Sequence, residues 1–109
     1  MRKIFLLIAM LLTVGLAGQA QTKKIKVLID NDYCGDPDGL VALAQQVLSP
    51  TTDIVGIVGG HLNDGPGFTT RKDQATESVE KANALLDVMG MKGKLKVVVG
   101  AESAMTSAD

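Results

Sequence analysis

Apolar residues recur along the chain with two different spacings, which predict three strands and two helices. Short runs rich in β-branched residues lie at 24–29, 53–58 and 96–99, and such runs are typical of buried strands. Residues 39–48 and 72–89 carry apolar side chains every three or four positions, so each would form a helix with one apolar face. The alternation predicts an α/β fold with an open, doubly wound, mainly parallel sheet.

Polar or glycine-rich segments follow all three predicted strands. The first strand leads into residues 30–32, the second into 59–67 and the third into 100–103. The carboxyl ends of parallel strands lie at one edge of a sheet, and ligands of open α/β folds bind there. We therefore expect a ligand site at this edge.

The N-terminus has the pattern of a secretory signal peptide. Residues 1–20 begin with two basic side chains, continue through an apolar run over 4–12 and end in small residues at Ala20. The alternative is a transmembrane anchor, but the apolar run is shorter than the roughly 20 residues that span a bilayer. Gln21 follows the expected cut, where a lipoprotein would have a cysteine. We expect an exported product, periplasmic or secreted, with no membrane contact after cleavage.

The amino-acid composition argues against several classes of protein and partner. Hydrophobic residues make up 46% of the 109 positions and charged residues 21%, which excludes a disordered acidic tail. Without residues 1–20, nine basic residues face twelve acidic ones. Aromatic residues account for 3%, so a stacking platform for nucleic acid is not expected. Cys34 is the only cysteine and has no partner for a disulfide within the chain.

Residues 21–109 are short for a complete domain of the predicted kind. No further helix is predicted after the third strand to cover the second face of the sheet, and domains usually run to about 100–200 residues. We expect this segment to be the N-terminal fragment of a larger α/β domain.

Four of the twelve acidic residues lie within nine positions after the first predicted strand, namely Asp30, Asp32, Asp36 and Asp38. Carboxylates this close repel one another unless a cation or hydrogen-bond donors compensate their charge. Because calcium and magnesium prefer oxygen ligands, this loop predicts a divalent-cation site. The alternative is a solvated turn in which Asp38 caps the following helix.

The acidic loop does not follow the EF-hand pattern. Counted from Asp30, position five is Cys34 and position twelve is Val41, so the bidentate glutamate of an EF-hand is missing. The loop also follows a predicted strand where an EF-hand has a helix.

The same loop resembles a known family. Asp30-Asn31-Asp32, followed by Gly35, Asp36 and Asp38, is similar to the Asp-Thr-Asp-Pro-Gly-x-Asp-Asp-Ala motif that opens the nucleoside hydrolases (inosine-uridine preferring). Later parts of the chain also resemble the family, which has a helix carrying alanine and asparagine and then a strand ending in Gly-Ala. The corresponding segments here are Ala82-Asn83-Ala84 and Gly100-Ala101.

Two departures from the family motif indicate a divergent, exported branch. Pro37 separates Asp36 from Asp38, and Tyr33-Cys34 stands where the family has Pro-Gly. The resemblance covers essentially all of residues 21–109 and implies hydrolysis of the N-glycosidic bond of a small-molecule ribonucleoside.

The resemblance also implies roles for the four aspartates. Asp32 and Asp38 would bind Ca²⁺, and Asp32 would also orient or deprotonate the attacking water. Asp30 would support the ligand shell and substrate binding, and Asp36 would hold ribose hydroxyls. Calcium that binds two hydroxyls and a water together lowers the pKa of the water and fixes its line of attack.

His61 follows the second predicted strand, near the Gly-Asn turn of the family. It is a candidate for binding a substrate hydroxyl or nucleobase, and an ordinary surface position is the alternative. For the chain as a whole, the alternative function is that of a non-catalytic fragment, or of a divergent protein that binds a cation or sugar. The choice of nucleoside stays open, as does a homo-oligomer of the full-length protein.

Overall fold

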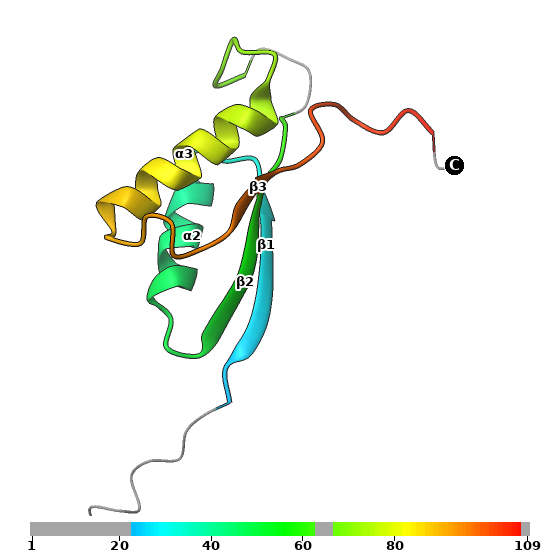
Figure 1. Cartoon of the computed structure of the whole chain (residues 1–109). Coiled ribbons are helices and arrows are strands. Elements are labelled where there is room, and N and C mark those ends of the chain that lie inside the picture. Colours follow the sequence, from blue (N-terminus) through cyan, green and yellow to red (C-terminus); the bar gives the residue numbers. More distant parts are fainter. Residues whose placement is uncertain (1–22, 63–66, 108–109) are drawn as a thin grey trace, which may run out of the picture.

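The computed structural model describes residues 23–62 and 67–107 as a small sheet packed against two helices (Figure 1). The elements are β1 (Ile25–Asn31), α2 (Asp38–Leu48), β2 (Thr52–Gly59), α3 (Gln74–Val88) and β3 (Val97–Val99). The predicted order is confirmed, and each end lies within two residues of its predicted place. The expected signal peptide, residues 1–20, lies outside the described residues. Neither of the described helices is long and apolar enough to cross a membrane.

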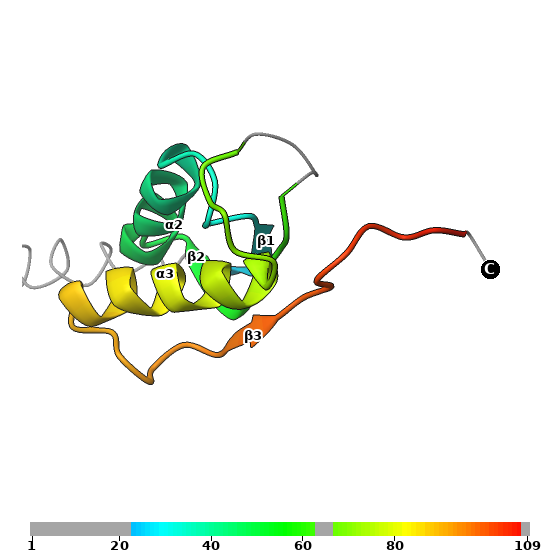
Figure 2. The ribbon, with the colours of Figure 1, turned by 90° about the horizontal axis from the view of Figure 1, so that it is seen from above.

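The three strands are parallel and lie in the order β1-β2-β3. Both helices lie on one face of this sheet (Figure 1) and contact each other, as the view from above shows (Figure 2). The described residues therefore form an α/β unit in which an open three-stranded parallel sheet alternates with two helices. The helices on both faces that a doubly wound sheet requires are not formed by this part of the chain.

The core lies between the sheet and the helices. Ile57 of β2 pairs in register with Ile29 of β1 and with Val97 of β3, so these three side chains point to the same face. The fully buried members of the core are Tyr33, Leu43, Ile57, Ala82 and Leu86. Each large apolar side chain that is buried here stabilises the fold by about 1.5–3 kcal/mol.

The opposite face of the sheet is exposed over the described residues. Leu28 of β1 is 65% exposed and Val98 of β3 is 37% exposed. Asp30 lies on this face and pairs in register with Val58. Parallel sheets are normally covered on both faces, so this apolar surface is unusual for a sheet of this type.

A close approach between β2 and α3 requires glycine at position 59. A Cβ at Gly59 would lie 2.8 Å from the backbone nitrogen of Val79 and 2.9 Å from the backbone oxygen of Ala75. The start of α3 therefore lies directly against the carboxyl end of β2. At its other end α3 stops at Gly90, whose φ of 69° is in the left-handed region that favours glycine.

Candidate functional site

The carboxyl ends of the three strands border an open pocket of about 450 Å³. Its lining comes from all three strand ends and consists of Asp30, Asn31, Asp32, Val58, Gly60, His61, Gly100 and Ala101. We call it the strand-end pocket. The fold thus brings three of the candidate site residues, Asp30, Asp32 and His61, to one cavity.

Asp36 and Asp38 do not line the strand-end pocket. Both are exposed, and Asp38 is the first residue of α2. Pro37 occupies the N-cap position of this helix, and the helix has no side-chain cap hydrogen bond, so Asp38 does not cap it. The four aspartates are therefore divided between the pocket and the start of α2.

Local hydrogen bonds hold Asp32 in place. The backbone N–H of Asp32 donates to Oδ1 of Asn31 over 2.8 Å. The backbone oxygen of Asp32 accepts from the N–H of Gly35, also over 2.8 Å. A Cβ at Gly39 would lie 2.7 Å from Nδ2 of Asn31, so the start of α2 packs directly on the asparagine that orients Asp32.

His61 is oriented by the segment that follows β3. Its Nδ1 lies 3.1 Å from the backbone oxygen of Ala101. Because a carbonyl oxygen only accepts hydrogen bonds, Nδ1 of His61 is the donor in this contact. His61 also lines a second cavity of about 350 Å³, together with residues of the α3 entry such as Arg71 and Gln74.

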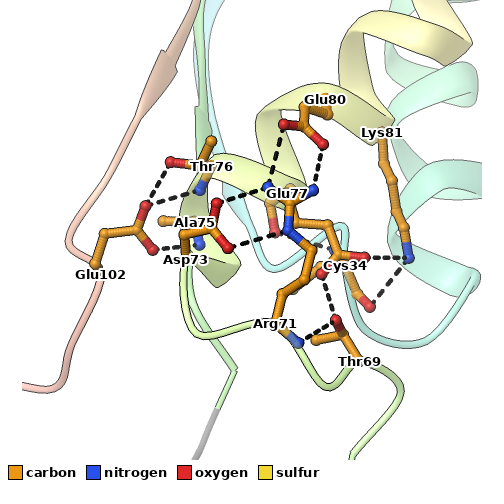
Figure 3. Close-up of polar contacts among 11 residues, drawn as sticks. Cys34, Thr69, Arg71, Asp73, Ala75, Thr76, Glu77, Glu80, Lys81 and Glu102 are labelled. Atoms are coloured by element: carbon orange, nitrogen blue, oxygen red, sulfur yellow. Dashed lines mark hydrogen bonds and ion pairs between the residues drawn. The ribbon is translucent and has the colours of Figure 1, made fainter.

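Glu102 ties the segment after β3 to the N-terminus of α3 (Figure 3). Its carboxylate accepts hydrogen bonds from the backbone N–H groups of Ala75 and Thr76 and from Oγ1 of Thr76, at 2.8, 3.0 and 2.6 Å. These bonds, that from the Thr76 hydroxyl foremost, hold the pKa of Glu102 below its usual range. Glu102 therefore anchors the third wall of the strand-end pocket.

Arg71 forms an ion-pair network at the entry to α3 (Figure 3). It contacts the carboxylates of Asp73 at 2.6 Å and of Glu80 at 2.5 Å. The hydrogen bond from Arg71 holds the pKa of Asp73 below its usual range. Since two carboxylates neutralise this guanidinium, it is not a free cation for an anionic ligand.

Ser78 of α3 is a site-supporting residue that the sequence reasoning missed. It is fully buried, and its hydroxyl bonds both to the loop after β1 and to the loop after β2. Its position does carry a signal, because it lies three residues after Ala75 and four before Ala82. A hydroxyl on the apolar stripe of a helix has to find a buried partner.

The described residues do not form a calcium site by themselves. Within residues 23–62 and 67–107, no group of three or more His, Cys, Asp or Glu side chains lies close enough to hold a metal ion. Asp30 and Asp32 supply oxygen donors of the right kind at the pocket, but calcium takes six to eight oxygen ligands. Calcium, with Asp32 and Asp38 as its ligands, stays a prediction.

Comparisons with family models, with curated proteins and with solved structures found no match to this chain. The resemblance to nucleoside hydrolases therefore rests on the residues quoted above and stays a prediction.

Proposed function

We propose that this chain forms part of the active site of an N-ribosyl hydrolase and binds a ribonucleoside in the strand-end pocket. The supporting observation is that Asp30, Asp32 and His61 meet at the ends of parallel strands around a cavity of about 450 Å³. Small-molecule sites commonly have volumes of roughly 300–1,000 Å³. The ribonucleoside itself is taken from the resemblance of the acidic loop.

Two carboxylates at the pocket suit the chemistry of a ribose ring. Asp30 and Asp32 can accept hydrogen bonds from neighbouring hydroxyls, and hydrogen bonds to a charged acceptor are stronger than neutral ones. When the N-glycosidic bond breaks, positive charge develops on the sugar as in an oxocarbenium ion. A nearby carboxylate stabilises that charge.

Asp32 is the proposed catalytic residue. The oxygen of a water molecule bonds to the anomeric carbon, and a proton of that water passes to the Asp32 carboxylate. The bond between the anomeric carbon and the base nitrogen breaks, and the base leaves with the electron pair. The hydrogen bonds of Asn31 and Gly35 to the Asp32 backbone hold this residue at the pocket.

The scheme contains no calcium step, because within residues 23–62 and 67–107 no group of three or more His, Cys, Asp or Glu side chains could hold a metal ion. Calcium bound by Asp32 and Asp38 stays a prediction. We place the site in a larger, doubly wound α/β domain of an exported protein, with residues 21–109 as its N-terminal portion.

Binding without hydrolysis is the second candidate function. It is favoured by the fact that, among the described residues, only Asp30 and Asp32 bring carboxylates to the strand-end pocket.

The test measures binding and turnover separately. Inosine and uridine are titrated calorimetrically, and released ribose is followed by a reducing-sugar assay. We expect binding and slow ribose release by the unaltered chain. Asp32→Asn should reduce release at least about a hundredfold, because a general base typically contributes 10²–10⁴-fold. Asp53→Asn, an exposed carboxylate near the other end of β2, is the control and should change neither quantity.

The outcomes separate the two candidate functions. Binding without ribose release supports the second candidate, and no binding of either nucleoside contradicts both. Each titration is repeated with added calcium and with EDTA. Tighter binding with calcium than with EDTA would support the calcium prediction, and equal affinities in the two arms would contradict it.

A further inference from the structure

Ser78 is a polar side chain with no exposed surface. It lies in the first half of α3, the helix that packs against the end of β2. Since the side chain is sealed from solvent, it cannot touch a ligand in the strand-end pocket. Any effect that it has on a ligand must pass through the groups it contacts.

The Ser78 hydroxyl links two separate loops. The backbone N–H of Cys34 donates to Oγ of Ser78 over 3.0 Å, and the Ser78 hydroxyl donates to the backbone oxygen of Gly60 over 2.8 Å. The hydrogen of the hydroxyl goes to Gly60, because a carbonyl only accepts, so a lone pair receives the N–H of Cys34. One side chain therefore satisfies a donor of the loop after β1 and an acceptor of the loop after β2.

Both partners of Ser78 lie next to residues of the pocket. Cys34 follows Asp32 by two residues, within the turn closed by the bond from Gly35 to Asp32. Gly60 directly precedes His61, and its own N–H donates to the backbone oxygen of Asn31 over 2.8 Å. The Ser78 link and the Gly60–Asn31 bond thus hold the Asp32 and His61 sides of the pocket together.

Lys81 supports the first loop from the same helix. It lies three residues after Ser78, and its Nζ donates to the backbone oxygen of Cys34 over 3.3 Å (Figure 3). Cys34 is thereby bound to α3 through both its N–H and its carbonyl group.

We infer that Ser78 is a positioning residue, which sets the separation of Asp32 and His61 across the strand-end pocket and so controls its affinity for a ribonucleoside. The identity of the ligand rests on the proposed function, whereas the link between the two loops does not. Without the hydroxyl, the N–H of Cys34 and the carbonyl of Gly60 lose a buried partner, which favours opening of both loops toward water.

The buried thiol of Cys34 provides a readout that needs no ligand. It is the only cysteine of the chain and is 0% exposed, so a thiol reagent such as DTNB reacts only when the loop opens. The rate then reports the population of the open form. Ser78→Ala is compared with Leu86→Val, which weakens the core two turns further along α3 without touching either loop bond. Urea unfolding gives the free energy of unfolding of each variant, so that the two modification rates can be compared at equal global stability.

We expect Ser78→Ala to raise the rate of Cys34 modification about tenfold over that of Leu86→Val at equal global stability. Equal rates in the two variants would overturn the inference. In the second measurement, Ser78→Ala should weaken inosine binding about tenfold, and Leu86→Val should leave it unchanged. Faster modification with unchanged inosine affinity would also contradict a positioning role.

The same measurements distinguish a wrong ligand assignment from a wrong inference about Ser78. If the unaltered chain does not bind inosine but Ser78→Ala still exposes Cys34, the link between the loops is supported and the ligand assignment is wrong.

Discussion

Tyr33 follows the polar end of β1 and is 1% exposed, although it stands where the resembled family has proline. Its ring belongs to the core cluster with Leu43 and Ile57. Among the described residues, however, its hydroxyl has no hydrogen-bond partner. Burial, and to a smaller extent the charge of Asp30, raise the pKa of Tyr33 to about 12. The packing of the Tyr33 ring in the core therefore also buries its hydroxyl, which gains no hydrogen bond there.

Tyr33→Phe should keep the ring and remove the unpaired hydroxyl. We expect the free energy of unfolding at neutral pH to be unchanged or raised by about 1 kcal/mol, since an unsatisfied buried hydroxyl is costly. The unfolded tyrosine releases its proton near pH 10 and the folded one near 12. The part of the free energy of unfolding that depends on a protonated Tyr33 is therefore fully present below pH 10. It is lost as the pH rises toward 12, because the unfolded chain releases this proton first.

Urea unfolding of both chains from neutral to alkaline pH measures this effect. The unaltered chain should lose more stability across the alkaline range than Tyr33→Phe does. If the free energy of unfolding falls equally with pH in the two chains, the Tyr33 hydroxyl is hydrogen-bonded or exposed to water in solution.

At the scale of elements, the packing of β2 against α3 positions the strand-end pocket. Gly59 lets the start of the helix lie against the end of the strand, and Glu102 then bonds to the N–H groups of the same helical turn. Ser78 follows one turn later and contacts the loops after β1 and β2. The first turns of α3 therefore contact all three walls of the pocket.

Gly59→Ala should push α3 away from the sheet. A Cβ at this position would lie 2.8 Å from the backbone nitrogen of Val79, and backbone cannot yield as a side chain can. We expect a loss of about 1–3 kcal/mol in the free energy of unfolding, as for other overpacked sites. Chemical denaturation measures the loss.

Gly60→Ala is the matched control for this change. Its Cβ would have no neighbour nearer than 3.5 Å, an ordinary contact, so stability should change by no more than about 0.5 kcal/mol. Equal losses in the two variants would argue against the close approach of α3.

At the scale of the whole molecule, the two faces of the sheet differ in their environment. Ile29 points to the helices and packs against the core, whereas its neighbour Leu28 is 65% exposed. Val98 lies on the same open face. Exposed apolar patches on a parallel sheet promote association, and the described residues leave this patch uncovered.

Leu28→Gln and Ile29→Gln test this difference on adjacent positions of one strand. We expect Leu28→Gln to change the free energy of unfolding by at most about 0.5 kcal/mol and to reduce concentration-dependent association in sedimentation experiments. Ile29→Gln should cost about 2–5 kcal/mol, as large changes to core residues do. Equal costs for the two variants would mean that the open face is covered in solution.

The elements of this fold could be predicted from the sequence because their signals are local. The apolar spacing over residues 72–89 predicted α3 to within two residues at each end. The runs at 24–29 and 53–58 likewise predicted two strands whose polar ends meet at one edge. Local periodicity could not show which faces of the sheet are covered, because that depends on how the elements pack.

The sequence by itself determined the order of strands and helices and the edge at which Asp30, Asp32 and His61 lie. Only the tertiary structure decided that Asp36 and Asp38 stay outside the pocket, and that Ser78 and Glu102 support it from α3 and from the segment after β3. Side-chain periodicity follows from backbone geometry within one element. A bond such as that between Cys34 and Ser78 joins residues 44 positions apart, so it exists only because packing brings two loops onto one helix.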